Sequence, residues 1–247
     1  MAQGTRVTRN LLHDNNSSED LFVEVNHGPF LVDNNLFLSG TSLLDMSEGG
    51  AYVHNLMAGK IVSRPEPGRS TPYHPAHSTA VAGLSTTKGG DNRFYNNLLV
   101  APAAEAASTK AAPNSRSSTG YGLWVYDARE YPLQTGGNVY CNGARPYAKE
   151  ARPLTPSGID PRPRIIEEGD RVFLQIAVGP ELKQAATTLV TTRLLGKATV
   201  PQLGYENADG SPVRIDSDYF GKKRNEAGPS AGPFEGPGEG DLKLKVW

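Results

Sequence analysis

The sequence of 247 residues has one cysteine, Cys141, and no apolar run of the roughly 20 residues needed to cross a bilayer. A single cysteine excludes an internal disulfide and any metal site built from several cysteines. An excess of one charge is also missing, because 25 basic and 26 acidic residues give a formal net charge of -1. Nucleic-acid binding needs a basic surface and membrane-surface binding needs a basic amphipathic segment, and the sequence has neither. We therefore expect no nucleic acid and no membrane as partner.

Residues 1–16 lack the continuous apolar stretch of a secretion signal, which predicts a cytoplasmic protein. A strand-like pattern begins within a few residues of Met1 without a polar lead-in, as it would if the start codon lay inside a longer gene. The length suits one large domain or two small ones. The sequence does not determine the oligomeric state, and a homo-oligomer is compatible with it.

Short apolar runs that lead into an asparagine recur through the first 145 residues, at Asn10, Asn35, Asn55, Asn97 and Asn142. The first two intervals, 25 and 20 residues, suit one coil each of a parallel β-helix. The next two, 42 and 45 residues, suit two coils, or one coil with a long excursion. Stacked asparagines can pair amide to amide along such a column, although asparagine is also simply common in turns. The repeated flanks favour the β-helix and hence an all-β fold.

Three parts of the chain are expected. Residues 1–145 form the coils, the proline-rich residues 146–163 form a connection, and residues 164–247 form a β-rich cap over one end of the solenoid. Two excursions interrupt the coils, a long ordered loop at 64–84 and a flexible low-complexity insertion at 101–120. Further strands are expected at 122–126, 171–178, 188–195 and 242–247, and a short helix at 180–187.

The stretch 20–35, DLFVEVNHGPFLVDNN, puts a glutamate into an otherwise apolar strand. Alternation places Phe22, Glu24 and Asn26 on one face of that strand. A carboxylate beside an aromatic ring and an amide is an unusual choice for solubility alone. A pKa raised by burial would suit Glu24 to proton donation near neutral pH, whereas the plainer interpretation is an ordinary solvent-facing residue.

A stacked coil also predicts where a second carboxylate would lie. Residues one coil apart at the same angle are separated by one strand spacing, ~4.8 Å, and a retaining glycosidase needs two carboxyl groups roughly 5 to 5.5 Å apart. One coil forward from Glu24 leads to Asp45 and Glu48, and one coil backward leads to the start of the chain. Geometry alone leaves both directions open.

Histidines gather in the first half of the chain, at His13, His27, His54, His74 and His77. The last two are three residues apart in a proline-containing loop, which is not a recognised spacing of metal ligands. We therefore expect no metal and no cofactor, and interpret each histidine as a donor to a sugar hydroxyl or as a packed loop residue. Tyr73 and Trp124 are candidate platforms for sugar stacking, unless they simply pack in the core.

Several stretches resemble, in order, the family 120 glycoside hydrolases, which are β-xylosidases built on a right-handed parallel β-helix. They are DLFVEVNHGPFLVDNN, SLLDMSEGGAYVHNLMAGKI, TPYHPAHST, GGDNRFYNNLLV and IDSDYFGKKRNEAGPSAGPFEGP. The resemblance covers essentially the whole chain. It implies a right-handed β-helix, incomplete at its N-terminal end, with a C-terminal β-strand cap.

The resemblance also implies a retaining mechanism that releases terminal β-D-xylose from small xylo-oligosaccharides. The glutamate of the EVNHG stretch matches Glu24, which takes the role of general acid/base. The nucleophilic aspartate of the family is expected just upstream of Met1 and so is absent from this sequence. Asp45 is then more simply a structural residue, and it stays the alternative carboxylate partner. The expected substrate-binding residues are Gln3, Asn26, His27 and His54.

Two other functions stay open. A non-catalytic carbohydrate-binding or structural β-solenoid would bind sugar without turnover. A β-helix polysaccharide lyase would use clustered aspartates with calcium, and the sequence has no such cluster.

Overall fold

The computed structural model describes residues 3–16, 18–103, 113–114 and 116–247. Strands dominate, and the described helices are the single turns η2 (Leu123–Tyr126), η3 (Pro180–Gln184) and α1 (Thr192–Leu195). The fold is therefore all-β, as predicted. Part of the expected insertion at 101–120 lies outside the described residues. In the part of the chain that is described, no helix is long and apolar enough to cross a membrane.

Three sheets of mainly parallel strands make up the first part of the structure. The first sheet contains, in spatial order, β1 (Arg6–Thr8), β4 (Phe30–Asp33), β7 (Gly50–Val53), β12 (Arg93–Tyr95) and β15 (Gln134–Gly136). The second contains β2 (Leu11–Leu12), β5 (Leu36–Phe37), β8 (Leu56–Met57), β13 (Leu98–Val100) and β16 (Val139–Cys141). The third contains β3 (Leu21–Val23), β6 (Thr41–Asp45), β9 (Lys60–Ser63) and the antiparallel β14 (Ser118–Gly120).

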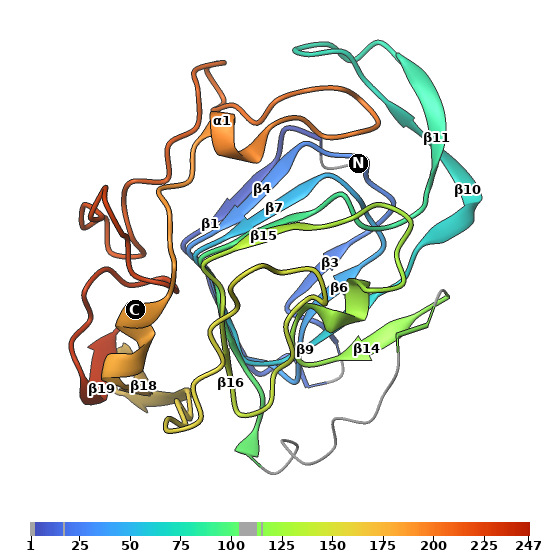
Figure 1. Cartoon of the computed structure of the whole chain (residues 1–247). Helices are drawn as coiled ribbons and strands as arrows, with labels where there is room; N and C mark the ends of the chain where they lie inside the picture. Colours follow the sequence, from blue (N-terminus) through green and yellow to red (C-terminus); the bar gives the residue numbers. More distant parts are fainter. Residues whose placement is uncertain (1–2, 17, 104–112, 115) are drawn as a thin grey trace.

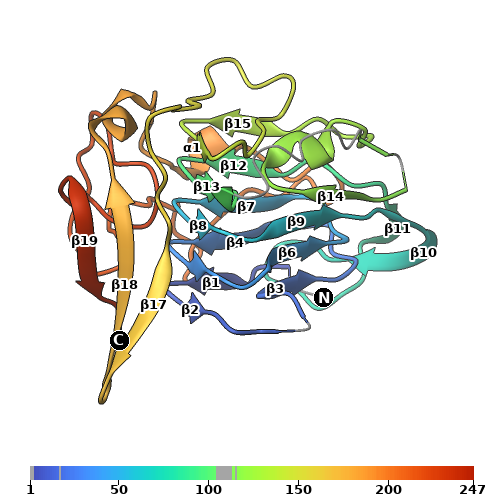
Figure 2. The same ribbon diagram turned by 90° about the horizontal axis from the view of Figure 1, so that it is seen from below.

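The chain visits the three sheets in turn, so that β1, β2 and β3 are followed by β4, β5 and β6, and then by β7, β8 and β9 (Figure 1). In the first sheet Arg6 lies beside Leu31, and Leu31 beside Ala51. These partners are 25 and 20 residues apart, which are the intervals predicted from the asparagines. Each circuit thus adds one layer of strands to the stack seen from the side in Figure 2.

Both faces of the second sheet are apolar. Alternate residues on its strands belong to two different buried clusters. The cluster inside the stack receives Phe37, Met57 and Leu99. The cluster on the outside receives Leu36, Leu56 and Leu98. Strands this short and apolar on both faces need a second layer to cover their outer side.

An amide ladder runs along the turns that lead into the second sheet, through Asn10, Asn35, Asn55, Asn97 and Asn138. Each Nδ2 donates to the Oδ1 of the next member at 2.9 to 3.1 Å. The predicted column is confirmed for its first four members, but the fifth is Asn138 and not Asn142. Asn138 follows Gly137, which has a positive φ of 67°, just as Asn55 follows His54 at 55°. The ladder position comes directly after a left-handed residue, whereas Asn142 is itself left-handed at 55°.

The C-terminal sheet consists of antiparallel β17 (Arg164–Glu168), β18 (Arg171–Val178) and β19 (Gly240–Lys245). The sequence prediction of a cap over one end of the solenoid is wrong. This sheet stands beside the stack, along the outer face of the second sheet (Figure 2). Leu174 and Ile176 of β18 pack there with the outward leucines of the second sheet. The apolar outer face therefore determines where the C-terminal sheet lies.

Residues 64–84 differ from the expected ordered loop. They contain β10 (Glu66–Tyr73), which pairs with β11 (Gly83–Thr87) as an antiparallel hairpin. The prediction is wrong because a segment rich in Pro, His and Ser is typical of a loop. This strand is stabilised by its pairing with β11 and not by its composition.

Two expected strands are helical turns instead. Residues 122–126 contain η2, whose four apolar residues are all buried, and a short buried run does not distinguish a strand from a helix by periodicity. Residues 188–195 end in α1, which begins because the Thr191 side chain accepts a hydrogen bond from the Leu194 N–H. The short helix expected at 180–187 is confirmed as η3.

Candidate functional site

Glu24 lies directly after β3, beside a hollow of about 520 Å³. The hollow is bounded by Phe22 and Glu24 from one side and by Arg69 and Thr71 of β10 from the other. Its floor is formed by apolar residues of the first coils, such as Phe30. Beyond this hollow, β1, β2 and β3 pair with one neighbour each among the described strands, so the site lies where the stack has a free edge.

The Glu24 side chain is 52% exposed and forms an ion pair of 2.8 Å with Arg69, which is 57% exposed. The burial that the sequence prediction relied on is therefore absent. Phe22, 44% exposed, points the same way, as alternation along the strand predicted. Asn26 does not follow that alternation, because Val25 adopts a positive φ of 32° and turns the chain inward. An accessible carboxylate held beside a guanidinium can exchange a proton with a bound molecule.

Asp45, the alternative partner, is buried and faces away from Glu24. In the pairing of β3 with β6 it lies beside Val23, which points into the core, whereas Glu24 is the next residue and points outward. Its Oδ2 accepts hydrogen bonds from Asn92 Nδ2 at 2.8 Å and from the Tyr126 hydroxyl at 2.7 Å. Burial raises the pKa of Asp45. Counting one coil forward from Glu24 therefore identified the correct neighbouring strand, β6, but Asp45 lies on the core side of that strand, opposite to the side of Glu24.

Glu48, the other carboxylate one coil forward, is also buried. Its Oε1 lies 2.8 Å from His27 Nδ1, and its Oε2 accepts the Lys88 N–H at 3.0 Å. Among the described residues, neither Asp45 nor Glu48 faces Glu24, so none of the forward partners supplies the second carboxyl group.

The expected substrate-binding residues are divided among different environments. Asn26 is buried beside the site, and its Nδ2 has no hydrogen-bond partner among the described residues. His27 is buried with both ring nitrogens in contact with polar groups. Gln3 lines an adjoining hollow of about 470 Å³, where its Nε2 donates to the His74 carbonyl oxygen at 2.9 Å.

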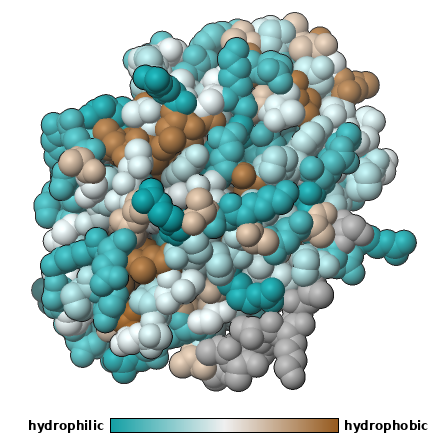
Figure 3. Space-filling model, viewed as in Figure 1, coloured by the Kyte–Doolittle hydropathy of each residue, from teal (hydrophilic) through white to brown (hydrophobic). Residues whose placement is uncertain are grey.

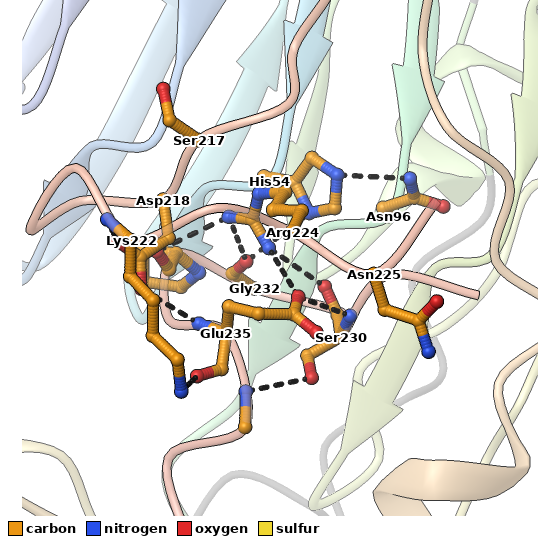
Figure 4. A network of polar contacts seen from close by, with 12 residues as sticks. His54, Asn96, Ser217, Asp218, Lys222, Arg224, Asn225, Ser230, Gly232 and Glu235 are labelled. Carbon is orange, nitrogen blue, oxygen red and sulfur yellow. Dashed lines mark hydrogen bonds and ion pairs between the residues drawn. The ribbon is translucent and has the colours of Figure 1, made fainter. Parts of the chain in front are cut away.

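His54 lies at a different corner, in the turn between β7 and β8. It is buried beneath the C-terminal segment, where it contacts Asn96 and the Gly232 carbonyl oxygen, near Arg224 (Figure 4). Burial, reinforced by the charge of Arg224, lowers the pKa of His54 well below its usual value and keeps the ring neutral. The structure does not bring His54 together with Glu24.

The proposed stacking platforms also differ. Trp124 is buried, donates from Nε1 to the Tyr121 carbonyl oxygen at 3.1 Å and lies under Arg145. Tyr73 is partly exposed and packs edge-on against His27, with ring centroids 6.2 Å apart. Sequence reasoning misses Arg69, because its proximity to Glu24 depends on a hairpin that the composition did not predict.

Comparisons with known proteins give one informative match. No protein-family model and no curated protein matches the chain. A solved structure, XylC in complex with xylose, is similar with 35% sequence identity and a TM-score of 0.88. The match covers 100% of this chain and 40% of XylC, so the chain spans about two fifths of the length of that protein. Over its whole length, the chain therefore shares its all-β architecture with a protein that binds xylose.

Proposed function

We propose that this chain is a catalytic portion of a xylose-acting glycoside hydrolase of the β-xylosidase type, with Glu24 as general acid/base. The observation that carries the proposal is the match to xylose-bound XylC along the entire chain, at 35% identity. The accessible carboxylate of Glu24 beside a hollow of about 520 Å³ supports it independently. The resemblance of the DLFVEVNHGPFLVDNN stretch to family 120 β-xylosidases supplies the finer assignment.

We also propose that residues 1–145 form a right-handed parallel β-helix. The three sheets visited in turn and the amide ladder support a solenoid, and the family resemblance supports its hand. The proposed division continues with a connection at 146–163 and a β-rich part at 164–247. That last part covers the flank of the solenoid, not its end.

In the proposed reaction Glu24 protonates the glycosidic oxygen of the leaving group and later removes a proton from the attacking water. Arg69 lies 2.8 Å from the carboxyl group and orients it beside the hollow. Gln3 and Asn26 contribute hydrogen bonds to the sugar. His27 and His54 already have polar partners at both ring nitrogens, so they are assigned no direct contact with the substrate.

A retaining mechanism needs a second carboxylate roughly 5 to 5.5 Å from the first. Asp45 and Glu48 face other partners, so the proposal assigns the nucleophilic aspartate to a strand outside the described residues, on the free side of β3. A carboxylate one strand spacing beyond β3 would meet the distance requirement.

The test is hydrolysis of an aryl β-xyloside by this chain joined to the part of XylC that it does not match. We expect turnover in this chimera and a loss of about 100-fold or more with Glu24→Gln, because an amide cannot donate the proton. Asp45→Asn is the matched control and keeps activity within a few-fold. Activity that survives Glu24→Gln, or that Asp45→Asn abolishes, contradicts the assignment.

A second candidate is a non-catalytic sugar-binding β-solenoid. It is favoured by one observation: among the described residues that line the hollow, Glu24 is the only carboxylate. This alternative predicts xylose binding by the chain without hydrolysis in the chimera, and an affinity that Glu24→Gln leaves unchanged.

A further inference from the structure

A buried imidazole ties the turn that carries Glu24 to the β10–β11 hairpin. His27, three residues after Glu24, is 2% exposed. Its Nε2 lies 2.9 Å from Thr71 Oγ1 on β10 and 3.2 Å from the Ser85 carbonyl oxygen on β11. Thr71 and Ser85 are directly opposite each other in the hairpin, so one ring contacts both strands at the same position.

The other ring nitrogen is fixed by the next coil. His27 Nδ1 lies 2.8 Å from Glu48 Oε1, and the second carboxyl oxygen of Glu48 accepts the N–H of Lys88, directly after β11. With Nδ1 held by this carboxylate, the ring is oriented so that Nε2 faces the Thr71 hydroxyl and the Ser85 carbonyl oxygen. Glu48 thus orients the ring and holds the end of the hairpin at once.

The exposed ion pair would not hold Arg69 in place by itself. Glu24 and Arg69 are both more than half exposed, and ion pairs at such positions contribute little to stability. Breaking the contact between His27 and Thr71 removes a hydrogen bond from the interior, where His27 and Thr71 are both almost fully buried, and this costs more. Arg69 stands two residues before Thr71 on β10, and both residues line the hollow, so the contact that fixes Thr71 also fixes the backbone from which Arg69 reaches Glu24.

We infer that His27, Glu48 and Thr71 are positioning residues that hold the hairpin against the coil and keep Arg69 beside Glu24. None of them reacts with the substrate. They keep the hairpin wall of the hollow, formed by Arg69, Thr71 and Pro72, at a fixed distance from the carboxylate. This inference rests on the proposed function of Glu24.

The test compares two buried threonines of the same hairpin in the intact chain. Thr71→Val removes the hydroxyl that contacts His27, and Thr71→Ser keeps it. Thr87→Val is the matched control, because the Thr87 hydroxyl is buried without a hydrogen-bond partner in the described part of the chain. The measurements are amide hydrogen exchange over residues 66–73 and 83–87, and the affinity for xylose.

We expect Thr71→Val to accelerate exchange in the hairpin at least about tenfold, while amides of β4 and β7 are unaffected. Glu48→Gln should act in the same direction. Thr71→Ser and Thr87→Val should resemble the unmodified protein. Xylose binding should weaken in Thr71→Val and in Arg69→Ala, but the double variant should lose little more than Arg69→Ala alone, because both changes act through the same contact between Arg69 and Glu24.

Unchanged hairpin exchange in Thr71→Val and Glu48→Gln would overturn the inference, whatever the xylose affinity. Fully additive losses in the double variant would also overturn it. A loosened hairpin together with a xylose affinity that neither Arg69→Ala nor Glu24→Gln alters would instead reject the proposed function at Glu24, so the two failures are distinguishable.

Discussion

At the scale of single residues, a buried asparagine of the amide ladder forms hydrogen bonds with both of the neighbouring coils. Asn55 Oδ1 accepts hydrogen bonds from the backbone N–H and the Nδ2 of Asn35, and its own Nδ2 donates to Asn97 Oδ1 and to the Val32 carbonyl oxygen. We expect Asn55→Ala to lower the free energy of unfolding by about 2–4 kcal/mol, because it leaves several of these buried groups unpaired. Urea unfolding measures the change. Asn16→Ala, at an exposed position, is the control and should change stability by less than about 0.5 kcal/mol; equal effects of the two changes would contradict a structural role for the ladder.

Asp45 gives a residue-scale prediction about pH. Its pKa is raised by burial, so between the ordinary value of about 3.9 and the raised value the folded state holds a proton that the unfolded state has released. The contribution of Asp45 to stability is therefore most favourable at low pH and falls as the pH rises through that window. Asp45→Asn does not titrate. We expect the stability of this variant relative to the unmodified protein to increase as the pH rises from about 4 and then to level off, as measured by urea unfolding at each pH. A difference that is independent of pH would show that Asp45 titrates normally.

At the scale of elements, the turn after Glu24 depends on two glycines, Gly28 and Gly49, whose backbones lie against each other across neighbouring coils. Gly49 has a positive φ of 73°, and a Cβ there would lie 2.6 Å from the His27 carbonyl oxygen. The contact is with backbone, which cannot move aside easily. We expect Gly49→Ala to destabilise the protein by about 2 kcal/mol or more, measured as a lowered midpoint of urea unfolding. Gly40→Ala is the control, because a Cβ at Gly40 meets no atom within 4 Å and its φ is not in the left-handed region. If both variants unfold at the same denaturant concentration, the close approach of the two turns is not a constraint.

The elements also show what sequence reasoning could and could not find. The coil intervals were predictable because the same turn recurs, with a left-handed residue followed by a ladder asparagine, as at His54 and Asn55. The fifth ladder member was missed because Gly137 and Asn138 lack the flanking sequence of the others, although they have the same backbone conformation. The β10–β11 hairpin was missed because β10, with the sequence EPGRSTPY, contains two prolines and a glycine and lacks the alternation of apolar residues that marks a half-buried strand. Arg69 was missed with it, so the sequence predicted one half of the candidate site, Glu24, and not the residue that faces it.

At the scale of the whole molecule, the surface is apolar in small separate groups on the face seen in Figure 3, where hydrophilic residues lie between them. The free edge of the stack is different. There β1, β2 and β3 each have one strand neighbour among the described residues, and apolar side chains such as Val7 and Val23 line the adjoining hollow. Unpaired strand edges beside apolar surface are sites where another chain can add strands.

We therefore expect this chain to associate through the free edge as its concentration rises, which sedimentation or light scattering at several concentrations would detect. Phe22→Lys should reduce the associated fraction, because Phe22 is exposed on the edge strand β3 and a lysine there opposes strand addition. Val81→Lys is the control, since Val81 is also exposed but lies in the loop between β10 and β11, away from the edge. The same weakening by both lysines would assign the association to general charge, and a monomer at every concentration would contradict an accessible edge. If only Phe22→Lys prevents association, the contact between chains lies at the free side of β3. That is the side on which the proposed second carboxylate lies, so the same edge would serve both assembly and catalysis.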